Sequence, residues 1–266
     1  MFAVRAGIGD RVVLQISLLL AVIALVFLRR AVPLALSNPC GFPEARWAWP
    51  EKAFTAGLVL FFLWMAALSA GRAPGRIDMG SLGSSLVLYA ALVLLLAGFL
   101  VFRNFNIRET FGLGVRGWNW RVVAGWLVMF LPLVYFVQSL SYAVSGPDSQ
   151  QAIVDFLLKS SGWQARAAVF GIAVIAAPAT EELIFRGCLY GALRKSSGRF
   201  PAIMISSVLF ALIHGHLPSL PGLLVLAVGL ALVYERCGSL WAPISMHAGF
   251  NALTIIAAIF WPDFAK

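Results

Sequence analysis

Eight long apolar segments, separated by charged or Gly- and Pro-rich breaks, constrain this chain more than any other feature. Backbone N–H and C=O groups inside lipid must be satisfied within the segment, so each segment is expected to be a helix. Each is close to the roughly 17 to 25 residues that a helix needs to cross a bilayer. The segments lie at roughly 11–36, 53–70, 82–102, 121–144, 166–194, 200–216, 218–235 and 240–262.

The composition supports the same conclusion. Of the 266 residues, 61% are hydrophobic and only 12% are charged, about half the charged share of a soluble domain. A soluble fold could not hide that much apolar side chain, which excludes a cytosolic globular enzyme, a disordered chain and a secreted disulfide scaffold. The sequence predicts an all-α, polytopic transmembrane helix bundle of about eight spans, forming a single integral membrane domain over 1–266.

Charge and cysteine content exclude further classes of protein. The net charge is +9, but the Lys and Arg residues collect near the ends of the apolar segments, where they meet lipid headgroups. No basic run is interleaved with aromatic residues outside those segments, so nucleic acid is not an expected partner. Cys40, Cys188 and Cys237 form no C-x-x-C pattern, so neither a disulfide framework nor a thiolate metal site is indicated.

The Lys and Arg residues also predict an orientation. With eight spans, 12 of them fall on one side and 7 on the other, with one inside a span. The richer side, which carries the breaks near 29–52, 103–121 and 194–199, is expected to be cytoplasmic, with both termini outside. Between the fourth and fifth spans, 148–160 reads as an interfacial amphipathic helix or as a short core helix in a loop.

Ionisable residues inside the late spans break the apolar pattern, and a membrane helix avoids such residues unless they are used. Glu182 and Arg186 are four residues apart, share a helix face and are expected to form a structural ion pair. Glu181 is turned by about 100° from Glu182 and can face a cavity instead. Glu235 and Arg236 end the seventh segment and read as an ordinary interfacial pair.

Two further late segments carry histidines. His214 ends Phe210-Ala211-Leu212-Ile213-His214, while His247 and Asn251 share a face because they are four residues apart. Counted from the cytoplasmic ends at the rise of an α-helix, Glu181 and His214 lie about 20 Å deep. His247 and Asn251 lie at about 10 to 16 Å. The overlap predicts one buried, wet cavity, opening toward the cytoplasm, although any one of these residues alone could simply join two helices.

The order E-E-x-x-x-R, F-x-x-x-H and H-x-x-x-N resembles the CPBP family of intramembrane endopeptidases, which includes the type II CAAX prenyl proteases and the bacterial Abi-type proteins. The likeness covers 166–262, the expected catalytic core. Phe111-Gly112-Leu113-Gly114 and Trp118 resemble a short stretch that often precedes that core. The helices within 1–145 have no assigned role.

The resemblance implies a role for each matching residue. Glu181 is expected to be the general base that activates water, and His214 its partner in orienting that water. His247 and Asn251 are expected to stabilise the oxyanion, with Glu182 and Arg186 in supporting roles. The resemblance implies no cofactor and no metal, a membrane-associated protein or peptide as substrate, and a place in the bacterial plasma (inner) membrane.

The chemistry of these residue types agrees, because peptide hydrolysis needs a base for water and donors for the developing oxyanion. No G-x-S-x-G is present and no cysteine lies in the three motifs, which disfavours a Ser or Cys nucleophile. Two alternatives stay open. One is a zinc peptidase that uses His214, His247 and a motif glutamate, although no H-E-x-x-H is present. The other is a non-enzymatic immunity factor, chaperone or transporter of the same fold.

Overall fold

In the computed structural model, the described residues are 8–37, 41–43, 46–69, 77–114, 118–145, 156 and 162–260, and they contain helices and no strand. The helices are α1 (Ile8–Leu36), α2 (Trp49–Ser69), α3 (Met79–Phe102), α4 (Ile107–Thr110), α5 (Trp120–Ser145), α7 (Trp163–Phe170), η1 (Gly171–Ala176), α8 (Ala177–Glu182), η2 (Leu183–Tyr190), α9 (Gly191–Ser197), α10 (Arg199–Leu212), η3 (Leu217–Ser219), α11 (Leu220–Cys237) and α12 (Trp241–Phe260). The all-α bundle predicted from the sequence is confirmed. The amphipathic helix predicted at 148–160 lies outside the described residues, apart from Phe156.

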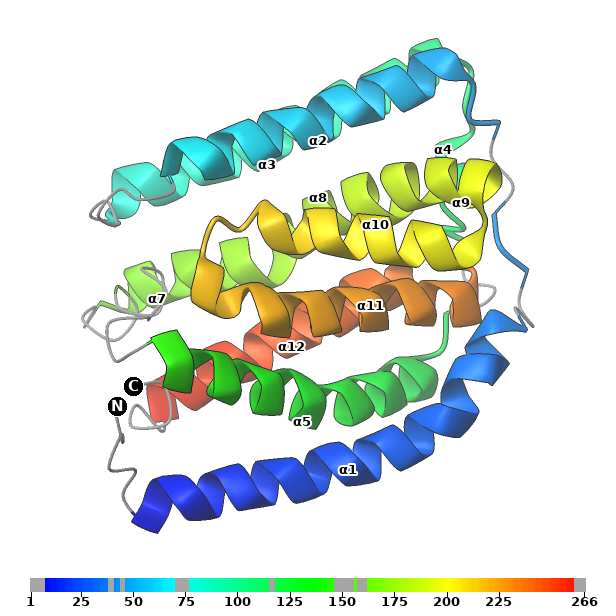
Figure 1. Cartoon of the computed structure of the whole chain (residues 1–266). Coiled ribbons are helices and arrows are strands. Elements are labelled where there is room, and N and C mark those ends of the chain that lie inside the picture. Colours follow the sequence, from blue (N-terminus) through cyan, green and yellow to red (C-terminus); the bar gives the residue numbers. More distant parts are fainter. Residues whose placement is uncertain are drawn as a thin grey trace.

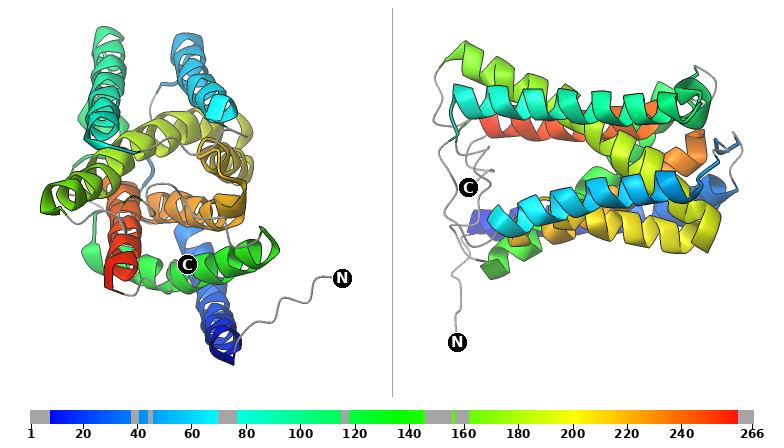
Figure 2. Two further views of the ribbon diagram at one scale, coloured as in Figure 1. Left: turned by 90° about the vertical axis from the view of Figure 1, so that its left-hand side faces the viewer. Right: turned by 90° about the horizontal axis from the view of Figure 1, so that it is seen from above.

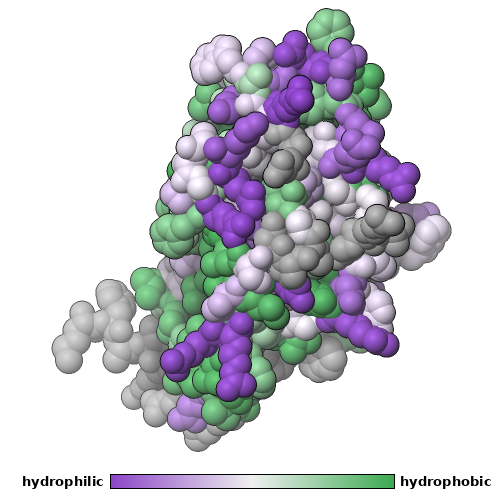
Figure 3. Space-filling model, turned by 90° about the vertical axis from the view of Figure 1, so that its right-hand side faces the viewer, coloured by the Kyte–Doolittle hydropathy of each residue, from purple (hydrophilic) through white to green (hydrophobic). Residues whose placement is uncertain are grey.

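The long helices run back and forth between two ends of the bundle (Figure 1). At one end, called the terminal end here, α1 begins and α12 finishes. At the other, called the basic end, lie the connections from α1 to α2, α3 to α5, α9 to α10 and α11 to α12. Figure 3 views the basic end and shows hydrophilic side chains gathered across it. The first residues of α1 and the last residues of α12 thus lie at the same end of the bundle.

Seven stretches of the described chain are long and apolar enough to cross a membrane, and one of them is the continuous helix from Trp163 to Ser197. The eighth apolar helix, α10, has only 14 residues, so the full span predicted for 200–216 is wrong. The chain turns after Leu212 because Gly215 adopts a φ of 61° and a short turn of helix, η3 (Leu217–Ser219), follows with Pro218 inside it. At about 1.5 Å per residue, α10 covers only about two thirds of a 30 Å hydrocarbon core.

Helix α11 forms the centre of the bundle. It packs against α1, α5, α10 and α12, and 56% of its apolar window is buried, against 17% for α3. Helices α2 and α3 lie on one side of the helix from Trp163 to Ser197 and stand apart from each other (Figure 2, left). The late helices therefore supply the interior, whereas α2 and α3 add an outer layer.

The segment Phe111-Gly112-Leu113-Gly114 fixes the start of α12. Leu240 N–H donates to the Phe111 carbonyl (3.0 Å), and Trp241 Nε1 donates to the Leu113 carbonyl (3.2 Å). Gly112 has a φ of 60°, and a Cβ there would collide with the Gly238 carbonyl. A Cβ on Gly187 would lie only 2.8 Å from the ring of Phe111, which is fully buried. This segment thereby anchors α12 against the helix that carries the glutamates.

Candidate active site

One continuous helix, formed by α7, η1, α8, η2 and α9, carries the glutamates and the arginine. Glu181 and Glu182 end α8, and Arg186 lies in η2. Arg186 Nη1 donates to Glu182 Oε1 at 2.8 Å, and both side chains are fully buried. The ion pair predicted from their spacing is confirmed. Arg186 Nη2 also donates to the Ala227 carbonyl of α11 (3.1 Å), so the pair joins two helices.

Glu182 has a second partner that the sequence did not reveal. His247 Nδ1 lies 2.9 Å from the same Oε1 atom, and His247 is 3% exposed. A carboxylate oxygen only accepts, so Nδ1 carries the proton and the histidine presents Nε2 to its other side. Glu182 therefore sets the orientation of His247, besides pairing with Arg186.

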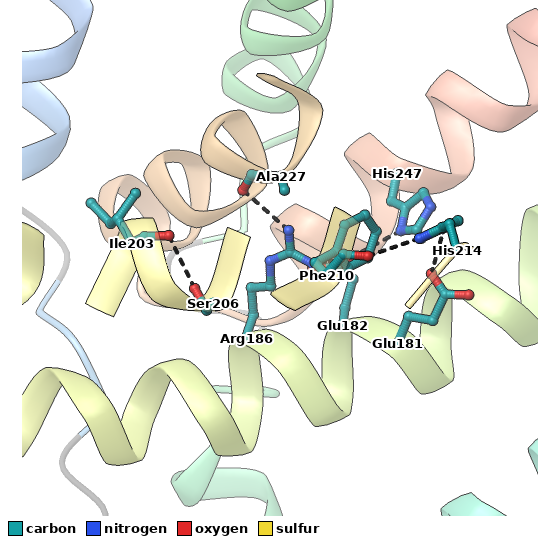
Figure 4. A network of polar contacts seen from close by, with 9 residues as sticks. All are labelled: Glu181, Glu182, Arg186, Ile203, Ser206, Phe210, His214, Ala227 and His247. Carbon is teal, nitrogen blue, oxygen red and sulfur yellow. Dashed lines mark hydrogen bonds and ion pairs between the residues drawn. The ribbon is translucent and has the colours of Figure 1, made fainter. Parts of the chain in front are cut away.

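His214 is oriented by its own helix. Its Nδ1 donates to the Phe210 carbonyl at 2.8 Å, which leaves Nε2 to point toward Glu181. The distance from His214 Nε2 to Glu181 Oε2 is 4.0 Å, and Figure 4 shows the two side chains facing each other. Glu181 Oε2 is buried and has no hydrogen-bond partner in the described part of the chain. The two predicted partners are therefore brought together, with unused acceptor atoms facing each other.

The ring of Phe210 separates these polar groups. It is fully buried, its centroid lies 4.9 Å from the His214 ring and 5.6 Å from the His247 ring, and the Arg186 guanidinium stacks over it at 4.3 Å. An aromatic face attracts a cation, so Phe210 stabilises the arginine while it spaces the two histidines. The phenylalanine of F-x-x-x-H is thus a packing centre for the site.

Asn251 lies one turn beyond His247 on α12, as its spacing predicts. Its Nδ2 donates to the Ala173 carbonyl of η1 at 2.7 Å. One amide proton of Asn251 is therefore donated to a neighbouring helix, and the other can donate a second hydrogen bond.

The exposure of these side chains rises away from the basic end. Arg186 and Glu182 have fully buried side chains, whereas 11% of Glu181 and 25% of His214 are exposed. His214 lies two residues after the end of the short α10, near the connection to α11 at the terminal end. This gradient runs against the prediction that the cavity opens at the basic, cytoplasmic end.

Three features of the site escaped the sequence analysis. Tyr89 of α3 lies close enough to Glu181 to interact with it electrostatically, and α3 packs on α8. The sequence contained a sign of this residue, because Tyr89 is the only polar side chain between 86 and 102. Gln138 of α5 donates to the Pro218 carbonyl (2.8 Å) and thereby holds the turn that follows His214. His216 of the same turn is half-buried, with Nδ1 2.7 Å from Ser219 Oγ.

A second polar cluster, called the basic-end cluster here, surrounds Glu235. The interpretation of Glu235 and Arg236 as an ordinary interfacial pair is wrong, because Glu235 is fully buried. Tyr190 Oη and Arg194 Nε each donate to Glu235 Oε1 at 2.5 Å. Arg199 Nε lies 3.6 Å from Oε2. Within the described residues, no group of three or more His, Cys, Asp and Glu side chains is placed to hold a metal ion.

The fold and site define a helical membrane protein with a buried carboxylate–histidine centre. Residues 163–253 match the family described as "Type II CAAX prenyl endopeptidase Rce1-like". The chain is also 30% identical over 155 residues to a protein of Bacillus subtilis (strain 168) described as "Putative membrane peptidase YdiL". That alignment covers 56% of this chain and 58% of the relative. No solved structure matches the chain.

All seven residues of the three motifs, from Glu181 to Asn251, fall inside the matched range 163–253. The resemblance to the CPBP family of CAAX proteases is therefore confirmed. The chain spans less than two thirds of the length of its Bacillus relative.

Proposed function

We propose that this protein is an intramembrane endopeptidase that hydrolyses a peptide bond of a membrane-associated protein or peptide, with Glu181 as the general base. The observation that carries the proposal is the facing pair Glu181 Oε2 and His214 Nε2, 4.0 Å apart. Both atoms are acceptors. A water about 2.8 Å from each would donate one proton to each atom, with an angle of about 90° between the two bonds. Such a water has its oxygen lone pairs free to attack a carbonyl.

The remaining residues supply the rest of the reaction. Glu181 takes a proton as the water oxygen bonds to the scissile carbonyl carbon, and His214 keeps the water in line. In its imidazolium form, His247 donates from Nε2 to the developing oxyanion, together with the free amide proton of Asn251. Protonated Glu181 then passes its proton to the leaving amine as the C–N bond breaks. Glu182 and Arg186 hold His247 in place and touch no reacting atom.

A comparison of membrane protein termini tests the proposal without a known substrate. Cells of a deletion strain that express either the wild-type protein or Glu181→Gln are compared by mass spectrometry of protein N- and C-termini. We expect at least one pair of new termini that depends on the wild-type protein and is lost in Glu181→Gln. Identical sets of termini would contradict the proposal and favour a non-enzymatic role.

Metal dependence separates this proposal from the zinc alternative. A water activated by a glutamate needs no metal, so purified protein should retain its activity after dialysis against EDTA. It should also bind less than one equivalent of transition metal. Tightly held zinc that is lost in parallel with activity would overturn the glutamate mechanism.

We also propose that the protein resides in the bacterial plasma (inner) membrane, with its substrate reaching Glu181 from the terminal end. The 12 to 7 imbalance of Lys and Arg, counted with eight spans, supports a cytoplasmic location for the basic end. Single cysteines at Ser197 and Gln164, in a background that lacks the native cysteines, test this orientation. An impermeant maleimide should label Gln164→Cys but not Ser197→Cys in intact cells; the reverse pattern would invert the protein.

A further inference from the structure

The helix that carries the glutamates changes its hydrogen-bond register just before them. In η1 the turns are wider than in an α-helix, and Ala177 N–H donates to the Ile172 carbonyl, five residues back. In that register the next donor is residue 178 and the next acceptor is the Ala173 carbonyl. Residue 178 is proline, which has no N–H. The helix backbone therefore offers the Ala173 carbonyl no donor from residue 178.

Asn251 supplies the missing donor from a different helix. Its Nδ2 lies 2.7 Å from the Ala173 oxygen, across 78 residues of sequence. An unsatisfied carbonyl in an apolar interior is costly, so this bond stabilises the structure. Wider turns of this kind occur frequently at functional sites.

We infer that Pro178 is a positioning residue for the reaction, because its missing N–H reserves the Ala173 carbonyl for Asn251. This inference rests on the proposed function. The bond fixes the plane of the Asn251 amide, so the second amide proton has a set direction. Asn251 lies one turn after His247, and Pro178 lies three residues before Glu181. The bond therefore sets the spacing between the helix of the general base and the helix of the oxyanion donors.

A residue with an N–H at position 178 would compete for the same carbonyl. In Pro178→Ala the helix can satisfy Ala173 by itself, which releases the side chain of Asn251. The helix is expected to remain intact or to gain stability, because the proline constraint is removed. The predicted loss is therefore one of positioning, without a loss of folding.

A double-mutant cycle in thermal stability tests the bond without any activity assay. In the wild-type background, Asn251→Ala strands the Ala173 carbonyl and should lower the unfolding temperature in detergent. In the Pro178→Ala background, the same Asn251→Ala change should have little or no effect. Equal losses in both backgrounds would overturn the inference. Pro178→Ser restores the same N–H and replaces Pro178→Ala in the cycle if that variant does not fold.

Kinetics then test the role in catalysis. Pro178→Ala should lower kcat by at least about tenfold, the kind of loss that a small misplacement of a reacting group causes, with little change in KM. Adding Asn251→Ala to Pro178→Ala should then lower kcat less than it does in the wild type. Pro132→Ala is the matched control, because Pro132 also lies inside an apolar helix, and it should leave kcat unchanged.

The outcomes separate the inference from the proposed function. Coupled stabilities with an unchanged kcat in Pro178→Ala would overturn the positioning role. Coupled stabilities with no cleavage by the wild-type protein would overturn the proposed function and leave the bond between Asn251 and η1 established.

Discussion

Two buried glutamate clusters in this protein differ in how fully their oxygens are used. In the basic-end cluster, Glu235 Oε1 accepts from Tyr190 and Arg194, and Oε2 accepts from Arg194 at 3.4 Å. In the middle of the bundle, Glu181 Oε2 and Glu182 Oε2 are buried without a hydrogen-bond partner among the described residues. Both clusters keep a carboxylate with a fully buried side chain next to a cation.

This difference indicates how to distinguish a buried carboxylate that supports the fold from one that takes part in the reaction. A buried polar atom without a partner is costly, and both oxygens of Glu235 have partners. An unused acceptor atom that faces a second unused acceptor can instead accept a hydrogen bond from a water or a substrate. If burial alone were used to choose the reacting carboxylate, Glu235 and Glu182 would rank above Glu181, which is the residue proposed to react.

The largest effect should follow from Glu181→Gln. The amide cannot act as a base, so cleavage should fall by at least about a hundredfold while expression and folding persist. In contrast, Glu235→Gln should leave cleavage per folded molecule near the wild-type value. A cleavage assay on equal amounts of folded protein makes the comparison; near-normal activity in Glu181→Gln would remove the distinction between the clusters.

Arg186→Ala should cause the largest loss of stability. It leaves Glu182 buried with only His247 as a partner, and breaking a buried pair costs about 3 to 5 kcal/mol. Thermal unfolding in detergent measures the loss, and activity should fall with it because His247 depends on Glu182. A fully stable but inactive Arg186→Ala would instead argue that the arginine takes part in the chemistry.

Arg194→Ala should cost less, roughly 1 to 3 kcal/mol, the range for a buried polar group that loses a partner. Arg199 and Tyr190 still contact Glu235, and 20% of the Arg194 side chain is exposed. The same unfolding measurement applies. A loss as large as that of Arg186→Ala would show that the extra partners of Glu235 contribute little.

Tyr190→Phe should have the smallest effect, about 1 kcal/mol, because it removes a single hydrogen bond and keeps the ring in place. The ring still packs edge-on against Phe42. Cleavage per folded molecule should be unchanged. A clear loss of activity without a loss of stability would link the basic-end cluster to the reaction.

The sequence predicted the motif residues of the site, because charged and polar side chains stand out within apolar segments. The Glu182–Arg186 pair followed from helical spacing alone. The bond from His247 to Glu182 did not, since it joins residues 65 positions apart. The bond from Asn251 to Ala173 also escaped, because it depends on the wider turns of η1. The short length of α10 was missed because the predicted segment was extended to 216, although Gly215 and Pro218 mark the turn that follows Leu212.

The sequence by itself determined that the apolar segments are helices, because each backbone group in lipid must bond within its own segment. It also determined which faces carry polar residues, because the helical period is a local property. Only the tertiary structure decided which acceptor atoms are saturated and which remain free. That outcome depends on how α8, α10 and α12 pack against each other, and packing places atoms by contacts that no local pattern encodes. Glu235 and Glu181 are the same residue type in the same kind of helix, and their neighbours alone make one a structural anchor and the other the proposed base.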